Sequence, residues 1–277
     1  MDYIELEFQV SHKQPWHEIL TSELAMEGFE SFTENNDKLQ AYIPAKEYNA
    51  SGVQRIIEKF KNEVTLSYEE KLIPTQNWNA QWESDFKPVT VDNRLVIKAP
   101  FHKIEEDYDI EIEIQPQMSF GTGHHNTTWL LSKVLLAKNI KDKNVLDVGT
   151  GTGILAVLAK KLGAKSVLGT EIDQGSYENA LENLKRNNCD EISVVLGDID
   201  KVKSQEFGVI IANINKNVLK NHMSSYSNLA KKNSVLLLSG FFITDAEELI
   251  KHASAYNFKL EETYAKDEWC VLEFSKN

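Results

Sequence analysis

Three glycines, Gly149, Gly151 and Gly153, alternate with threonines directly after the apolar run at 144–148. Apolar residues then recur at helical spacing over 154–162. A buried strand, a glycine turn and a helix in this order are typical of a Rossmann-like nucleotide site. Glycine suits such a turn because, without a Cβ atom, it tolerates positive φ and lets a ligand approach the backbone.

The spacing of these glycines separates two classes of ligand. A dinucleotide fingerprint, G-x-G-x-x-G, would place its third glycine at Ile154, whereas this chain has G-x-G-x-G preceded by Asp147. A sulfonium cofactor lacks a pyrophosphate, and it needs backbone access for its amino-acid tail and an acid for its ribose. Glu171 follows Gly149 by 22 residues, the place of an acid that binds ribose hydroxyls. The pattern therefore favours S-adenosylmethionine over NAD.

Polar residues follow three expected strands in turn. Glu171, Asp198 and Asn213 each stand at or just after the end of an apolar run. Because open α/β sheets bind ligands at the carboxyl ends of their strands, we expect these side chains to face one pocket.

The elements that must position these residues alternate along the second part of the chain. We expect strands at 95–97, 109–114, 144–148, 166–171, 192–196, 207–212 and 234–239, and helices from near 129, at 154–162, 174–187, 218–229 and 246–256. A closing strand pair at 258–264 and 269–274 then predicts an antiparallel edge. The expected fold class is α/β, a Rossmann-like parallel sheet with an antiparallel edge strand.

The first part of the chain predicts a separate domain. Residues 1–66 give the order β-α-β-β-α-β, which is that of a small α+β ferredoxin-like unit. Its 12 acidic and 6 basic residues indicate either a solvated face or a docking surface for a basic partner. Residues 67–91 are expected to form a linker, in which Trp78 and Trp82 lie one helical turn apart and anchor a helix. The remainder, 92–277, is the expected catalytic domain.

The loop at 115–131 holds more Gly, Thr and His than a turn requires. Asn126, Thr127 or Thr128 is expected to cap the following helix. His124 and His125 are adjacent, and no further ligand stands at metal spacing, so no metal site is expected.

Composition limits the function classes. A chain of 277 residues with 42% apolar and 26% charged residues is an ordinary globular protein. Its net charge of −12 argues against non-specific nucleic-acid binding, which depends on phosphate neutralisation. Two cysteines, Cys189 and Cys270, are too few for a disulfide scaffold. No signal peptide and no apolar run of about 20 residues are found, so we expect a cytoplasmic protein away from membranes.

Several motifs together resemble one family, that of the ribosomal protein L11 methyltransferases (bacterial protein methyltransferase A). They are Q-P-Q-M-S-F-G-T-G-H-H-N-T-T, V-L-D-V-G-T-G-T-G-I-L-A, I-I-A-N-I, the late E-W-C, and W-x-x-x-W-x-x-D-F-K-P at 78–88. The resemblance covers the whole chain, and the loop with F-G-T-G-H-H is its most distinctive part. It departs at Gln117 and Ser119, where the family has P-G-M-A-F, and at Glu171, where the family has Asp.

The resemblance implies a class I methyltransferase that uses S-adenosylmethionine to methylate the α-amine and lysine side chains of ribosomal protein L11. By matching motif positions, it implies that four residues contact the cofactor: Thr128, Gly149, Glu171 and Asn213. Phe120, Thr122 and Gly151 are expected to line the same pocket, as is Asp198 at its strand end. Aspartate and glutamate can both hold a ribose, so the change at Glu171 puts little in doubt.

The reaction itself suggests three catalytic residues. An amine must be neutral to attack a methyl group, yet the ordinary pKa of lysine is about 10.4. Oxygen acceptors from Asn213 and from the backbone as far as Asn215 are expected to orient the amine. His124 is a candidate proton acceptor, with a purely structural place in its loop as the alternative.

Other functions remain open from the sequence. A methyltransferase of this fold acting on another protein, RNA or a small-molecule amine is the nearest alternative, although the acidic charge disfavours RNA. The absence of N-P-P-Y after the fourth strand argues against adenine and glutamine N-methylating relatives. A non-catalytic ribosome-assembly binder is disfavoured by the intact glycines. We expect a monomer.

Overall fold

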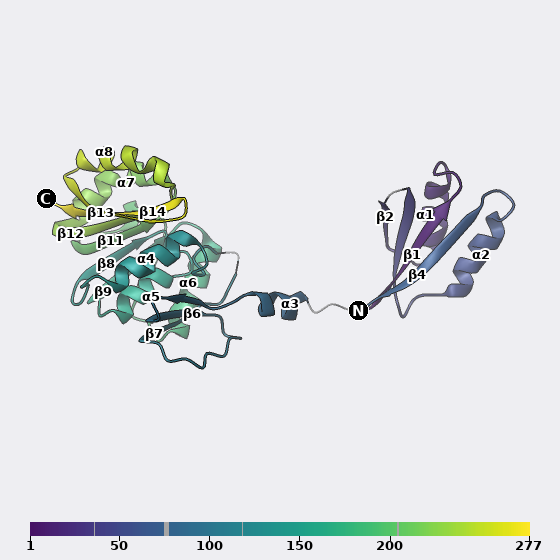
Figure 1. Cartoon of the computed structure of the whole chain (residues 1–277), viewed down its shortest axis with the longest axis horizontal. Coiled ribbons are helices and arrows are strands. Elements are labelled where there is room, and N and C mark those ends of the chain that lie inside the picture. Colours follow the sequence, from purple (N-terminus) through teal and green to yellow (C-terminus); the bar gives the residue numbers. More distant parts are fainter. Residues whose placement is uncertain (36, 75–77, 118, 204) are drawn as a thin grey trace. The chain divides into compact units, whose positions relative to one another are not determined.

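The computed structural model describes residues 1–35, 37–74, 78–117, 119–203 and 205–277, without the side chains at 78–81. The chain divides into two compact units, Met1–Ser84 and Asp85–Asn277 (Figure 1).

The first unit is a four-stranded antiparallel sheet in the order β2-β3-β1-β4. Its strands are β1 (Tyr3–Val10), β2 (Ser31–Asn35), β3 (Lys38–Pro44) and β4 (Leu66–Ile73). Helices α1 (Trp16–Met26) and α2 (Ala50–Phe60) complete the β-α-β-β-α-β order that the sequence predicted. Alternate β1 residues, Ile4, Leu6 and Phe8, enter one core with residues of both helices, as a strand period of two requires.

This unit extends further along the chain than the sequence indicated. β4 pairs with β1 from Leu66 to Ile73, so the ladder continues seven residues past the predicted domain end at 66. Residues 69–71 are all charged, and this stretch has no apolar alternation that would reveal a strand. Helix α3 (Trp78–Asp85) follows, where Trp82 is 45% exposed. The predicted anchoring role of the Trp78 side chain lies outside the described residues.

The second unit is built on a seven-stranded sheet in the order β10-β9-β8-β11-β12-β14-β13. Its strands are β8 (Asn144–Val148), β9 (Ser166–Glu171), β10 (Ser193–Leu196), β11 (Phe207–Asn213), β12 (Ala230–Ser239), β13 (Phe258–Lys266) and β14 (Trp269–Lys276). The first five in this spatial order run parallel, and β14 and β13 form an antiparallel edge. This is the doubly covered α/β sheet that the alternation of elements predicted.

Helices cover both faces of this sheet (Figure 1). One face carries α4 (Asn126–Leu136), α5 (Ile154–Lys161) and α6 (Gln174–Arg186), and the other carries α7 (Lys216–Leu229) and α8 (Ala246–Ser254). Neighbouring residues of β8 enter different cores: Val145 packs on the α4–α6 side, whereas Leu146 and Val148 pack on the α7–α8 side. Burial of both faces explains why the central strands are almost continuously apolar in sequence.

A small three-stranded sheet precedes the large one, in the order β5 (Val89–Val91), β6 (Leu95–Lys98) and β7 (Ile110–Glu113). β5 was not predicted, because three residues are too few to show a period. Helix α4 also begins earlier than expected. Its N-cap is His125, whose Nδ1 accepts the backbone N–H of Thr127 at 3.3 Å, so the expected capping by Asn126, Thr127 or Thr128 was wrong.

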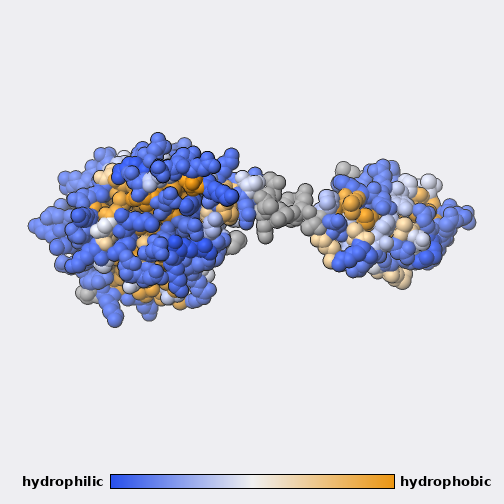
Figure 2. Space-filling view, turned by 90° about the horizontal axis from the view of Figure 1, so that it is seen from below, coloured by the Kyte–Doolittle hydropathy of each residue, from blue (hydrophilic) through white to orange (hydrophobic). Residues whose placement is uncertain are grey.

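Hydrophilic residues cover most of each unit on the face shown in Figure 2, with hydrophobic residues in smaller areas. Exposed large apolar side chains include Phe120, Ile172 and Phe242. Single exposed apolar residues are ordinary on a protein surface, so they acquire meaning only beside a cavity. Within the described residues, no helix is both long enough and apolar enough to cross a membrane.

Candidate functional site

The glycine turn at the end of β8 requires glycine at each of its three positions. Gly149, Gly151 and Gly153 all have positive φ, between 56° and 82°. A Cβ atom on Gly151 would lie 2.3 Å from the carbonyl oxygen of Phe120, and one on Gly149 would lie 2.4 Å from a methyl group of Ile214. The absence of Cβ atoms therefore lets Phe120 and Ile214 lie directly against the turn, and Gly149 and Gly151 also line a cavity where strands β8, β9 and β11 end.

Hydrogen bonds hold the Phe120 loop against this turn. The backbone N–H of Thr152 donates to the carbonyl oxygen of Phe120 at 3.0 Å, and its hydroxyl donates to that of Gly121 at 2.6 Å. The loop predicted to distinguish this chain thus lies directly on the predicted cofactor turn. Two segments about 30 residues apart in sequence form one wall.

Asp147 supports the turn from inside the protein. Its carboxylate is fully buried and accepts the hydroxyl of Thr150 at 2.6 Å. Desolvation by burial raises the pKa of Asp147 to about 6, the hydrogen bond from Thr150 opposes this rise, and the charge of Glu171 adds to it. Asp147 is therefore a structural acid beneath the turn.

Glu171, at the end of β9, bridges the turn and the next strand end. Its Oε2 accepts the N–H of Gly151 at 2.9 Å, and its Oε1 accepts the N–H groups of Ile172 and Asp173 at 2.9 and 3.1 Å. Three backbone donors hold the carboxylate in one place at the mouth of a cavity. The additional methylene, relative to aspartate, is what the side chain uses to reach back to Gly151.

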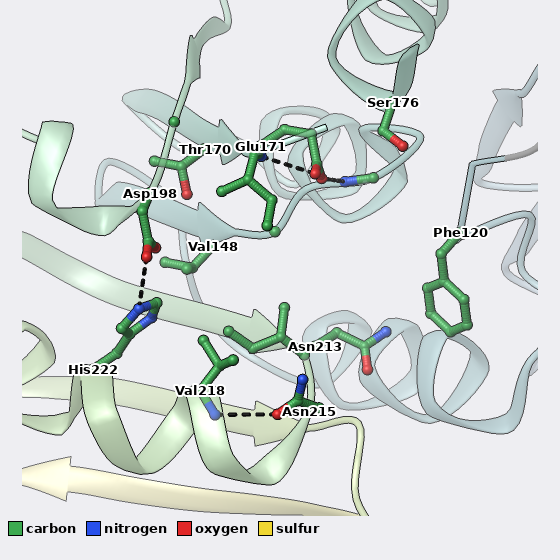
Figure 3. A pocket seen from close by; sticks show the side chains of 15 residues that line it. Phe120, Val148, Thr170, Glu171, Ser176, Asp198, Asn213, Asn215, Val218 and His222 are labelled. Carbon is green, nitrogen blue, oxygen red and sulfur yellow. Dashed lines mark hydrogen bonds and ion pairs between the residues drawn. The ribbon is translucent and has the colours of Figure 1, made fainter. Parts of the chain in front are cut away.

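A cavity of about 390 Å³ opens at these strand ends (Figure 3). We refer to it as the larger cavity of the site, because a second and smaller cavity adjoins it. Six of the eight residues predicted to bind a cofactor line it: Phe120, Gly149, Gly151, Glu171, Asp198 and Asn213. Asp198 and Phe120 lie at opposite ends of the view, with Glu171 between them. The larger cavity thus offers two carboxylates, a glycine turn and an amide to one elongated ligand.

Asn213, the last residue of β11, has an acceptor without a partner. Its Nδ2 is 3.4 Å from the hydroxyl oxygen of Thr128, and its buried Oδ1 has no hydrogen-bond partner in the part of the chain described. Thr128 is 1% exposed and is not among the described residues that line this cavity. Asn215 acts differently, because its Oδ1 accepts the N–H of Val218 at 3.1 Å and caps α7.

A second cavity of about 190 Å³ adjoins the first, and we refer to it as the aromatic cavity. The two cavities share four lining residues: Phe120, Asn213, Ile214 and Asn215. Its further lining includes His125 and Trp269, whose ring centroids are 4.6 Å apart, while the rings of Phe120 and His125 are 5.1 Å apart. Burial lowers the pKa of His125, which favours the neutral ring. An apolar space with a free amide oxygen suits a neutral amine.

Two predicted residues lie elsewhere. Neither His124 nor Thr122 is among the described residues that line the two cavities. The His124 Nε2 is 2.8 Å from the carbonyl oxygen of Lys87, and its ring centroid is 4.5 Å from that of Phe86. Its Nδ1 is 3.1 Å from the Thr122 hydroxyl. These contacts fit the alternative of a structural role for His124, which ties its loop to residues 86–87.

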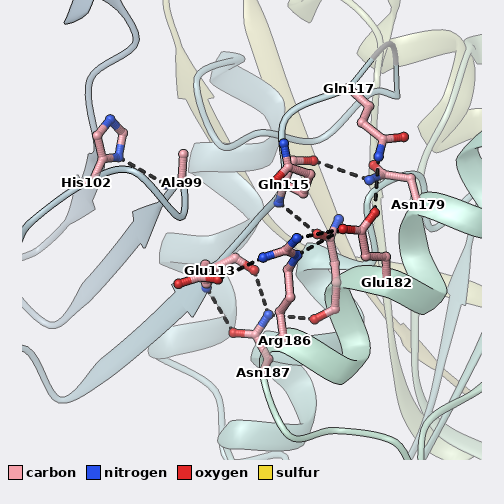
Figure 4. Close-up of polar contacts among 10 residues, drawn as sticks. Ala99, His102, Glu113, Gln115, Gln117, Asn179, Glu182, Arg186 and Asn187 are labelled. Atoms are coloured by element: carbon pink, nitrogen blue, oxygen red, sulfur yellow. Dashed lines mark hydrogen bonds and ion pairs between the residues drawn. The ribbon is translucent and has the colours of Figure 1, made fainter. Parts of the chain in front are cut away.

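Asparagines of α6 hold the segment that leads into the Phe120 loop (Figure 4). Asn187, which directly follows that helix, contacts both backbone groups of Glu113, accepting at 2.9 Å and donating at 2.7 Å. Asn183 accepts the N–H of Gln115 at 2.8 Å and donates to the carbonyl oxygen of Thr152 at 2.9 Å, so one amide links this segment to the glycine turn. The cavity wall is therefore supported from behind by a chain of amides.

With this geometry in view, the comparison with known proteins is decisive. The family model described as ribosomal protein L11 methyltransferase (PrmA) matches residues 8–277. The chain belongs to the ribosomal protein L11 methyltransferase family. A family member from Porphyromonas gingivalis is 39% identical, over 99% of this chain and 98% of its own length. A family member from Bacteroides thetaiotaomicron is 36% identical, over 99% of this chain and 100% of its own length.

A solved structure extends the likeness to the fold. The ribosomal protein L11 methylase of Lactobacillus delbrueckii subsp. bulgaricus matches with a TM-score of 0.65 at 26% identity, over 69% of this chain and all of that one. A methyltransferase from Pyrococcus furiosus, at 18% identity and a TM-score of 0.52 over 60% of this chain and 89% of that one, shares the fold. As a member of the family, the chain is a protein methyltransferase with S-adenosylmethionine as its cofactor.

The departures from the family pattern can now be placed. The Gln117 side chain donates to Glu182 at 3.1 Å on the surface of α6, away from the described lining of both cavities. Residues of the larger cavity that the sequence did not reveal include Val218 and His222 of α7. The sequence could have indicated them, because Asn215, Val218 and His222 follow one another at three and four residues, and residues at this spacing share a helix face.

Proposed function

We propose that this chain transfers methyl groups from S-adenosylmethionine to ribosomal protein L11, at its α-amino group and at lysine side chains. The observation that supports this most directly is the buried, unpartnered Oδ1 of Asn213, which borders both cavities in the described part of the chain. In this proposal the larger cavity holds the cofactor, and the aromatic cavity receives the amine. The names of the relatives support the choice of L11 as the substrate.

The residues around the larger cavity suit this cofactor. S-adenosylmethionine supplies a methyl group on a sulfonium centre. Glu171 offers its carboxylate to the ribose hydroxyls, and the turn at Gly149 and Gly151, which lines the cavity without side chains, lets the amino-acid tail approach closely. Asp198, at the far end of the larger cavity, is then available to the adenine ring of the cofactor.

The chain's main contribution to the transfer is positioning. Bound S-adenosylmethionine would supply the methyl group, and the residues of this chain would hold the amine so that its lone pair faces that group. The Oδ1 of Asn213 accepts an N–H of the amine and thereby directs the lone pair. An apolar surrounding lowers the pKa of a lysine amine because it disfavours the cation. The proton released by the methylated amine passes to water.

Neither histidine of the loop is needed as a base. The Nδ1 of His125 accepts the N–H of Thr127, so in the neutral ring the proton is on Nε2. His124 faces the backbone of Lys87.

The acidic first unit supports a protein substrate. Residues 1–84 hold 15 acidic and 7 basic side chains, which favours encounter with a basic ribosomal protein and disfavours nucleic acid. We assign this unit to substrate recognition, in an enzyme that works as a monomer in the cytoplasm, where ribosomal proteins are found.

The test is methyl transfer into ribosomes that lack methylation, with labelled S-adenosylmethionine and mass spectrometry of the products. We expect the label in L11 amines, and none in L11 whose amines were methylated chemically beforehand. Asn213→Ala should lower kcat by about 100-fold, the loss of one positioned hydrogen bond in the transition state. Wild-type turnover and cofactor affinity in this variant would eliminate the role given to Asn213. Label in RNA, or no heat on titration with S-adenosylmethionine, would overturn the function itself.

A further inference from the structure

At one end of the larger cavity, His222 makes contacts that have no part in the proposed function. His222 of α7 lines the cavity, and its Nε2 is 3.0 Å from the Oδ2 of Asp198. The hydroxyl of Tyr226, a fully buried residue, is 3.5 Å from the Nδ1 of the same ring. Because a carboxylate only accepts hydrogen bonds, the Nε2 carries the proton and donates it to Asp198.

Asp198 is thereby fixed at both oxygens. Its Oδ1 accepts the backbone N–H of Ile199 at 2.7 Å, and its Oδ2 accepts the imidazole N–H. Each oxygen still has a lone pair for a further donor. A side chain that is half exposed would otherwise sample several rotamers, and ordering it has an entropic cost.

Helix α7 connects this end of the cavity with the methyl-transfer end. It begins at the capping residue Asn215, which borders both cavities, and its residues Val218 and His222 line the larger one. These residues follow each other at helical spacing along one face. Figure 3 shows the Asp198–His222 pair at one end, Phe120 at the other, and Asn215 beside Asn213 between them. A ligand that contacts Asp198 is therefore aligned by the same helix that borders the acceptor amine.

We propose that His222 is a positioning residue that holds Asp198 as an acceptor for the 6-amino group of the cofactor's purine, and so makes the enzyme reject a 6-oxo purine. This rests on the proposed function. A 6-amino group presents an N–H to the carboxylate, whereas a 6-oxo group presents a second acceptor, which the carboxylate repels. Without His222, the carboxylate turns away from the cavity and the two purines bind more equally.

The experiment measures binding of S-adenosylhomocysteine and of S-inosylhomocysteine, its 6-oxo analogue, to the full chain by isothermal titration. The wild type should prefer the amino compound by about 100-fold or more, as sites built on hydrogen bonds do. His222→Leu should bind S-adenosylhomocysteine about tenfold more weakly, the effect of one lost hydrogen bond, and should retain little of the preference. His222→Gln, whose amide can present an N–H to Asp198, should recover most of both.

Kinetics and a matched control separate this role from a merely structural one. His222→Leu should raise KM for S-adenosylmethionine and leave kcat within about twofold, since the methyl-transfer end is intact. His252→Leu makes the same change in α8, where the imidazole faces the carbonyl oxygen of Lys220, and should alter neither. In an Asp198→Asn background, His222→Leu should add little, because coupled residues are non-additive.

The outcomes are distinguishable. If His222→Leu binds both nucleosides as the wild type does, or loses affinity for both equally, the inference about His222 is overturned while the proposed function stands. The same holds if His222→Gln behaves like His222→Leu although its thermal unfolding matches the wild type. If the wild type binds neither nucleoside, the proposed function fails and this inference fails with it.

Discussion

The two cavities meet at Asn213, yet they are built in different ways. The larger cavity is made of backbone and of carboxylates that backbone N–H groups hold, as at Glu171. The aromatic cavity is made of rings, with Trp269 brought from a distant position in the chain to Phe120 and His125 of one loop. A cavity wall made of backbone leaves no room for an added side-chain atom, whereas one ring in a packed cluster can be replaced by another ring. Ligand binding in the larger cavity should therefore be sensitive to small substitutions, and binding in the aromatic cavity to the loss of an aromatic ring.

The largest effect is expected from a single methyl group in the glycine turn. In Gly151→Ala the Cβ would be 2.3 Å from the carbonyl oxygen of Phe120, at a φ of 56°. Strain of about 3 kcal/mol should weaken S-adenosylmethionine binding by about 100-fold, measured by titration calorimetry. Gly175→Ala is the matched control, because its Cβ would be in ordinary contact at 3.4 Å. Equal binding by both variants would contradict the backbone account of this wall.

A second prediction concerns the buried acid beneath the turn. The pKa of Asp147 is raised to about 6 from 3.8, so the folded state holds its proton more tightly than the unfolded chain. The stability due to this proton is present below about pH 4 and lost as the pH rises through about 6, at most about 3 kcal/mol. The unfolding free energy of Asp147→Asn minus that of wild type should therefore increase between about pH 4 and about pH 8. A difference that is flat with pH would show that the buried carboxyl does not titrate.

The aromatic cavity should lose substrate affinity when a ring is removed. Trp269→Ala removes the face that packs 4.6 Å from His125, and should raise KM for L11 by about tenfold, the scale of one cation–π or apolar contact. KM for S-adenosylmethionine should stay the same. Trp269→Phe keeps an aromatic face and should lie close to the wild type. If both variants change the cofactor KM instead, the two cavities do not have separate roles.

The smallest effect tests a residue that the sequence placed in the cofactor pocket. Thr122→Ala removes a hydroxyl whose partner is the Nδ1 of His124, outside the described lining of both cavities. Cofactor affinity should change by less than about twofold, as for most substitutions away from a site. Thr128→Ala removes the side-chain partner of Asn213 and should lower kcat more. A larger loss of cofactor affinity in Thr122→Ala would support the prediction from sequence that Thr122 lines the cofactor pocket.

Features of the fold and the site could be predicted where their residues lie close together in the sequence, and not where they depend on contacts between distant segments. The turn at Gly149–Gly153 and the acid at Glu171 were found because they follow strands at fixed spacing. His222 and Trp269 were not identified as lining residues, because each approaches the site from an element far from the glycine turn in sequence. The first unit was predicted to end too early, at 66, since β4 pairs through its backbone with β1 as far as Ile73 and its charged residues show no pattern.

The sequence by itself determined the class of fold, the cofactor and the family, because these depend on short segments whose chemistry is complete within themselves. Only the tertiary structure decided which side chains share a cavity. It separated His124 from His125, made Asn215 a helix cap and left the Oδ1 of Asn213 unpartnered within the described chain. The physical reason is that a hydrogen bond is satisfied by whatever lies within about 3 Å, and sequence spacing does not measure that distance across elements.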